Sequence, residues 1–128
     1  MSMDSGRLVL RQPLPNGLTL ELWDHSRPVA GDRWYTLMET RIAIPVRADS
    51  LPPDLKPLAD QVVQALGAEI IFSHQEERNF IAASEHPSLL KDMQDRILKL
   101  ALSYFGHENF APKFIRKTYA AHQPRPQL

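Results

Sequence analysis

Apolar and polar side chains alternate most regularly between Arg33 and Val46. One set of alternate positions is largely apolar: Trp34, Thr36, Met38, Thr40, Ile42, Ile44 and Val46. The other set is mixed: Tyr35, Leu37, Glu39, Arg41, Ala43 and Pro45. Because successive side chains in a strand point to opposite faces of a sheet, the segment predicts a long strand with one face toward a core and one half exposed. Proline cannot donate to a sheet ladder, so Pro45 predicts an edge position or a bulge at the strand's end.

Two shorter segments before this strand also alternate in the manner of strands. Residues 7–12 form the first of them. Asn16 and Gly17 then predict a tight turn, because both residues tolerate a positive φ. Residues 18–27 form the second, and Pro28 is expected to end it. Together with the long strand, they predict an antiparallel meander.

Two segments have apolar residues at helical spacing. The first covers residues 55–66, with Asp54 as the N-cap and Gly67 as the left-handed residue that ends the helix. The second covers residues 84–105, is the longest helix expected, and stops at Gly106. Its apolar stripe consists of Leu89, Met93, Ile97, Leu100 and Tyr104.

The segment between these helices predicts two more strands, at residues 68–74 and 78–83. Gln75, Glu76 and Glu77 would form the turn between them, although this turn contains no glycine. The order of elements is therefore strands, helix, strands, helix. It predicts an α+β fold, in which an antiparallel sheet of about five strands has two or three helices packed on one face.

The last segment, residues 109–122, fits two structures. Asn109 as a cap and Pro112 in the first turn favour a helix, whereas residues 114–119 also alternate as a strand would. We favour the helix, and the pattern does not decide whether it docks on its own chain or on a neighbour's. Prolines after residue 123 predict a flexible tail from there onward.

Composition is that of an ordinary folded domain, with 43% hydrophobic and 23% charged residues among 128. We therefore treat residues 1–128 as a single domain. The absence of cysteine excludes disulfides, thiolate zinc sites and cysteine nucleophiles. No apolar run approaches the roughly 18 residues that span a bilayer, and the first residues do not have the pattern of a secretory signal. We expect a cytoplasmic protein without membrane contact.

The best chemical cluster in the sequence is His74, Glu76 and Glu77. A histidine with carboxylates can hold a divalent metal or perform acid–base chemistry. The same residues are also typical of a solvated turn, and no spacing identifies a further ligand. The sequence contains no nucleophile elbow and no phosphate-binding glycine loop. We therefore predict no cofactor and no metal, and we favour a protein that is not an enzyme.

The C-terminal segment is a candidate ligand site. Its residues 107–128 carry four basic groups and one acidic group. The candidate ligand-binding residues are Lys113, Arg116, Lys117 and Tyr119. Basic groups neutralise phosphates and aromatic rings stack on bases, but the aromatic residues of this segment can equally anchor it to a core. Nucleic acid is not the expected partner, because the net charge of the whole chain is zero.

Trp23 is the candidate interface residue. It falls on the strand face opposite three alternating leucines, so it should point outward, together with Glu21 and His25. Exposed tryptophans are frequent anchors of protein interfaces. Our leading hypothesis is a small non-enzymatic protein that associates with itself, most simply as a dimer. The alternatives are a module that binds a small anionic ligand or single-stranded nucleic acid, and a metal-assisted enzyme around His74.

Overall fold

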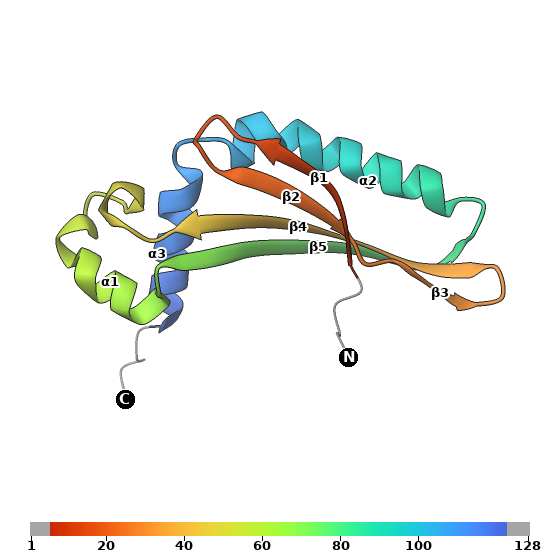
Figure 1. Ribbon diagram of the computed structural model, residues 1–128, viewed down its shortest axis with the longest axis horizontal. Coiled ribbons are helices and arrows are strands. Elements are labelled where there is room, and N and C mark those ends of the chain that lie inside the picture. Colours follow the sequence, from red (N-terminus) through yellow and green to blue (C-terminus); the bar gives the residue numbers. More distant parts are fainter. Residues whose placement is uncertain (1–5, 123–128) are drawn as a thin grey trace.

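The computed structural model describes residues 6–122 of the chain (Figure 1). Its strands are β1 (Arg7–Pro13), β2 (Thr19–Asp24), β3 (Arg27–Ala30), β4 (Arg33–Pro45) and β5 (Glu69–Ala82). Its α-helices are α1 (Ala59–Leu66), α2 (His86–Leu100) and α3 (Phe110–His122). Short 3-10 turns lie at Ala48–Ser50 and Lys56–Leu58, and a π-helical turn, Ala101–Phe105, extends α2. The predicted α+β fold with its antiparallel sheet is confirmed.

All five strands belong to one antiparallel sheet with β4 at its centre. On one side of β4 lie β2 and the short β3, and β1 pairs with the far side of β2. On the other side, β5 pairs with β4 from one end to the other. The predicted meander of three strands is therefore present as β1, β2 and β4, with β3 added at the start of β4.

The prediction of two strands at residues 68–74 and 78–83 is wrong. A single strand, β5, runs through the expected turn, and Gln75, Glu76 and Glu77 face Glu39, Met38 and Leu37 of β4. None of the three supplies the positive φ that a tight hairpin requires. The long edge of β4 offers backbone partners for all of them, so the chain continues straight.

Two further expectations about strand ends need correction. Pro28 does not end a strand: it lies inside β3 and faces Trp34 of β4. Within the described residues β3 pairs only with β4, so its outer edge can hold a proline. Pro45 is the last residue of β4, as predicted for a strand end, but β4 is central and not an edge strand.

Asp54 does not cap α1, because the α-helix begins at Ala59 after a 3-10 turn. Its carboxylate instead accepts two hydrogen bonds from Arg116 of α3, at 2.6 and 2.7 Å. The prediction for the other end of this helix is confirmed, since Gly67 is the C-cap and has a φ of +87°. Glycine reaches that conformation without a steric penalty.

The core lies between the helices and one face of the sheet. The inward positions of β4 are buried as the alternation predicted, and Leu20 and Leu22 of β2 join them. The helices contribute Val62, Met93, Ile97, Phe110 and Ile115 to the same cluster. The helix prediction for residues 109–122 is confirmed, and α3 docks on its own chain, where Phe72 of β5 contacts the rings of Phe110 and Phe114.

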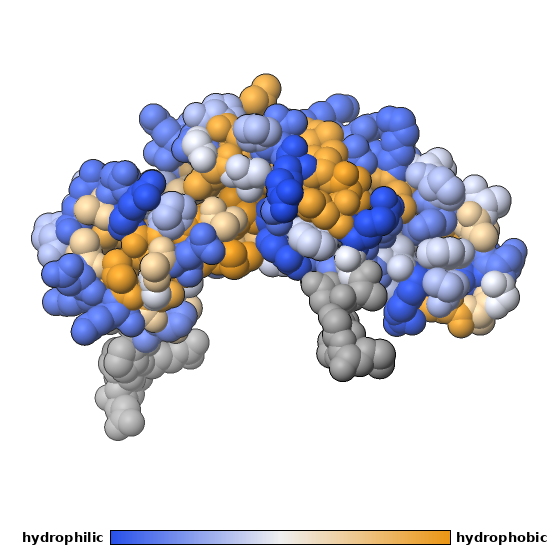
Figure 2. Space-filling view, viewed as in Figure 1, coloured by the Kyte–Doolittle hydropathy of each residue, from blue (hydrophilic) through white to orange (hydrophobic). Residues whose placement is uncertain are grey.

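In Figure 1, α2 runs along the sheet, whereas α1 and α3 gather at the end where β4 stops and β5 begins. Figure 2 shows an arched molecule whose apolar residues form patches separated by hydrophilic ones. Among the described residues, no helix combines the length and the apolar character needed to span a bilayer. The predicted tail from residue 123 lies outside the described part of the chain.

Candidate functional site

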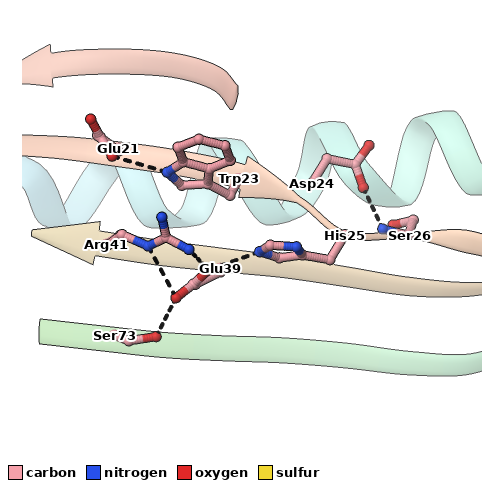
Figure 3. A network of polar contacts seen from close by, with 8 residues as sticks. All are labelled: Glu21, Trp23, Asp24, His25, Ser26, Glu39, Arg41 and Ser73. Carbon is pink, nitrogen blue, oxygen red and sulfur yellow. Dashed lines mark hydrogen bonds and ion pairs between the residues drawn. The ribbon is translucent and has the colours of Figure 1, made fainter. Parts of the chain in front are cut away.

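The sheet face opposite the helices, here called the open face, carries a connected set of polar side chains (Figure 3). Contacts link β1 to β5 across the sheet through Arg11, Glu21, Trp23, Arg41, Glu39 and Ser73. His25, from the segment between β2 and β3, joins the set at Glu39. Antiparallel pairing places these residues side by side, because alternate residues of every strand point to this face.

Glu39 is the centre of the set. Arg41 Nη2 donates to Glu39 Oε1 at 2.8 Å, and Ser73 Oγ donates to Oε2 at 2.6 Å. The ring nitrogen Nε2 of His25 lies 2.8 Å from Oε1. Neighbouring side chains leave Glu39 only 6% exposed, although no helix of residues 6–122 covers this face. The carboxylate is thus held in one position by groups from three segments of the chain.

The pKa of Glu39 reflects these contacts. Burial alone would raise it, but the hydrogen bonds from Arg41, Ser73 and His25 outweigh burial and lower the pKa to about 2. The pKa of Glu21 is also lowered, first by the hydrogen bond from Trp23 and then by the one from Arg11. Both carboxylates are therefore negative at neutral pH, and neither can donate a proton as a general acid there.

Trp23 and Arg41 form the most distinctive pair on the open face. The guanidinium carbon of Arg41 lies 4.7 Å from the centre of the Trp23 ring, which is a cation–π contact. The indole Nε1–H of Trp23 donates to Glu21 Oε1 at 3.0 Å. The ring and the cation are thus oriented before anything binds, and both remain partly exposed.

A cleft of about 480 Å³ extends from Arg41 toward the start of α3. Glu21 and Arg41 line one end of it, and Arg47, Asp49 and Glu108 contribute further charges. Arg47 donates to Asp49 at 2.9 Å, so charges of both signs are paired within the lining. A cleft of mixed charge has little electrostatic preference for an anion over a cation.

The structure brings together the three residues predicted as an interface. Trp23 and Glu21 lie on the open face of β2, and His25 reaches the same face. Sequence reasoning missed Glu39, Arg41 and Ser73 as members of the site. The alternation along β4 placed Glu39 and Arg41 on the mixed face, but their contact with Ser73 depends on cross-strand register, for which the sequence has no local signal.

The residues of the predicted metal or acid–base cluster do not converge. His74 and Glu76 face the helix side of β5, where Glu76 accepts a hydrogen bond from Arg96 at 3.1 Å. Glu77 faces the open side and accepts from the hydroxyl of Tyr35. In the described part of the chain, no group of three or more histidines and carboxylates could hold a metal ion. The cluster was inferred from a turn, and that turn is a continuous strand.

The predicted ligand residues of the C-terminal segment lie on α3. Arg116 is bound to Asp54, and Tyr119 packs against the core. Lys113 and Lys117 border a notch of about 160 Å³ whose other lining residues are Phe72, Tyr104, Phe110 and Phe114. Most of these rings pack in or against the core, in agreement with the alternative hypothesis that the aromatic residues anchor this segment. Tyr104, however, is 55% exposed.

A second cleft, of about 490 Å³, lies at the start of α2. His86 is fixed there, because its ring stacks on Trp34 with centroids 4.4 Å apart and its Nδ1 lies 2.8 Å from Thr36 Oγ1. Asp24 lines the same cleft, but its carboxylate accepts from the backbone of Ser26 and from Arg7. One oriented imidazole does not by itself form an acid–base pair.

The sequence matches no protein-family model, and no curated protein or solved structure is significantly similar to the chain. The function must therefore be argued from the geometry of the site.

Proposed function

We propose that the protein is not an enzyme and acts through association, with the open face as its binding surface. The observation that carries this proposal is the Trp23–Arg41 pair, which is oriented on a sheet face that makes no part of the helix-covered core. Tryptophan and arginine are the side chains that most often dominate the energy of protein interfaces. Because Glu21 and Glu39 already fix the pair, little side-chain entropy is lost on binding.

The partner that we propose is a second copy of the chain. Charges of both signs alternate across the open face at Arg11, Glu21 and Arg41, so two copies can meet without like charges opposing one another throughout. The net charge is zero, and no long-range repulsion keeps the copies apart. Two such faces in contact would form two stacked sheets, about 10 Å apart, with helices on the outside.

A substitution at Trp23 tests this proposal. Trp23→Glu should give a folded protein of smaller assembly size, because the core lies on the other side of the sheet. Leu102→Glu is the matched control, since Leu102 is 71% exposed and belongs to the turn after α2. Native mass spectrometry reports the assembly size, and circular dichroism reports folding. An assembly of unchanged size in the Trp23→Glu variant would exclude the open face as the interface.

A second candidate function is the binding of a small anionic ligand or single-stranded nucleic acid at α3. The notch between Lys113, Lys117 and the exposed ring of Tyr104 supports it, because these groups suit a phosphate next to an aromatic base. A labelled oligothymidylate should then bind more weakly as salt increases, and Lys113→Ala/Lys117→Ala should abolish binding. Lys56→Ala is the control. Binding that is indifferent to salt and to the double substitution would contradict this function.

A further inference from the structure

The outer edge of β5 has no strand partner among residues 6–122. This edge strand has 14 residues, whereas strands usually have about five or six. Ser73, His74, Gln75 and all residues from Glu77 to Phe80 are exposed, so no helix or loop of the described chain covers that part of the strand. An unpaired edge of this kind presents a row of backbone donors and acceptors to other chains.

We propose that β5 pairs antiparallel with β5 of a second copy, about a two-fold axis at Gln75. The two five-stranded sheets would then become one continuous sheet with all helices on the same side. This surface is the backbone edge of β5 and not the part of the open face around Trp23, so the inference does not depend on the function proposed above. The proposed pairing specifies the partner, a second copy of the chain, together with the strand and the register of the contact.

Symmetry limits the possible registers. In an antiparallel pair, residues that face each other lie on the same side of the sheet. If the helices of both copies are to lie on one side, the residue at the two-fold axis must face the same residue of the second copy. Each choice of axial residue then fixes every other facing pair, and the charges along β5 can be compared for each choice.

The register at Gln75 is complementary. On the helix side, His74 faces the partner's Glu76, which supplies a hydrogen-bond acceptor, and Phe72 faces the partner's Arg78. On the open side, Ser73, whose hydroxyl already donates to Glu39, faces the partner's Glu77 as a neutral side chain, and the axial pair is two neutral amides. No facing pair between residues 72 and 78 joins like charges, and opposite or hydrogen-bonding partners facing one another stabilise a sheet.

Registers with the axis at a neighbouring residue pair the charges of β5 less favourably. An axis at Glu76 or at Glu77 places that carboxylate directly against the same carboxylate of the second copy. An axis at Ser73 places Glu69 against the partner's Glu77. An axis at His74 places Glu76 and Glu77 against the partner's Phe72 and Ile71, so that neither carboxylate faces a polar partner. Like charges and unpaired charges facing each other destabilise a strand pair, so the Gln75 register is favoured.

The bulge in β5 limits how far this pairing extends. Phe80 has a φ of +60°, and the β4–β5 register shifts between the partners of Trp34 and Thr36. Bulges disrupt a ladder and twist a strand edge away from further pairing. The regular part of the edge therefore ends near Asn79, which matches the residue 72–78 span of the proposed pairing.

Cysteine cross-linking tests the register directly, because the chain contains no cysteine. In Gln75→Cys the two thiols would meet across the axis at a Cα separation of about 4.5–5.5 Å, which a disulfide can bridge. Glu77→Cys is the matched control on the same face. Its thiols would lie four residues apart in register, or roughly 14 Å, beyond the reach of a disulfide.

Mild oxidation should convert Gln75→Cys into a covalent dimer and leave Glu77→Cys monomeric on a non-reducing gel. Cross-linking of both variants at the same rate would reflect random collision and would overturn the proposal. Faster cross-linking of Glu77→Cys than of Gln75→Cys would also overturn the proposal, because it would place the two-fold axis at another residue.

Sedimentation of the variants distinguishes this interface from the open face. His74→Glu places a carboxylate against the partner's Glu76 and should weaken dimerisation by about tenfold. Gln64→Glu, an exposed position on α1, adds a negative charge away from the edge and should leave the dimer intact. A dimer that is lost in His74→Glu but kept in Trp23→Glu supports the edge and rejects the open face.

The opposite pattern, with the dimer lost in Trp23→Glu and kept in His74→Glu, would overturn the edge pairing and support the open face. A wild-type protein that stays monomeric at about 100 μM would also overturn it, since such affinity is too weak for a specific dimer. The edge would then be open to a strand of a different protein.

Discussion

The two faces of the sheet hold the molecule together by different means. On the helix side, apolar side chains of β2 and β4 meet the helices and are almost entirely buried. On the open face, charged side chains hold one another in place around Glu39, and none of the described helices covers them. The hydrophobic term dominates folding, so the helix side accounts for most of the stability. We therefore expect most substitutions on the open face to affect stability less than substitutions on the helix side.

The largest expected effect contrasts these two faces. Ile42→Ala on the helix side should lower the free energy of unfolding by about 3 kcal/mol, because it leaves a cavity at a fully buried position. Trp23→Ala on the open face should lower it by only about 1 kcal/mol, through the lost contact with Arg41. Urea unfolding measures both. Equal losses would show that the open face is as important for stability as the core.

Acid should weaken the contacts around Glu39 on the open face. The pKa of Glu39 is about 2 in the folded chain, against 4.5 without its partners, so its contribution is complete above pH 5 and disappears as pH falls toward 2. The loss should be at most about 3 kcal/mol, given 1.36 kcal/mol per pKa unit. Glu39→Gln should lack this pH dependence, and Ser73→Ala should retain part of it. Identical pH profiles for Glu39→Gln and wild type would contradict the assignment.

Two threonines on the helix side make a matched pair. Thr40 Oγ1 is buried and has no hydrogen-bond partner among the described residues, whereas Thr36 Oγ1 lies 2.8 Å from His86 Nδ1. Thr40→Val should raise the melting temperature, with a gain of about 1 kcal/mol from removing an unsatisfied polar group. Thr36→Val should instead lower it. A loss in both variants would point to a buried water at Thr40.

The smallest expected effect concerns the bulge. Phe80 is 66% exposed at a φ of +60°, so its backbone is strained while its ring makes only an exposed contact with the guanidinium of Arg33, 5.9 Å from the ring centre. Phe80→Gly should stabilise the fold by about 0.5 kcal/mol, after the entropy cost of glycine is subtracted. Ile81→Gly, at the next and half-buried position, should destabilise it. A loss of stability in both would mean that the Phe80 ring packs in solution.

Local patterns predicted much of the helix side. The alternation along β4 and the helical spacing in α2 identified the buried residues, because each is a property of a short stretch of chain. The prediction of two strands in place of β5 was wrong because the outcome depends on a partner strand that is distant in sequence. A run of Gln75, Glu76 and Glu77 suits a turn or an exposed strand, and the length of β4 decides between them.

The site on the open face was only partly predictable. The alternation of β2 showed that Trp23 points outward with Glu21. The position of Glu39 in the same set depends on pairing between β2 and β4, and that of Ser73 depends on pairing between β4 and β5. Register follows from how complete faces are buried, which no single segment encodes.

The separation of β4 from β5 along the chain also affects how the protein folds. Strands β1, β2 and β4 follow one another closely, whereas α1 lies between β4 and β5. Because closing a longer loop costs more entropy, we expect the β4–β5 ladder to form after the meander. Until then the edge of β4 is open to strands of other chains during synthesis. On the ribosome, that edge therefore stays open at least until residue 82 has been released.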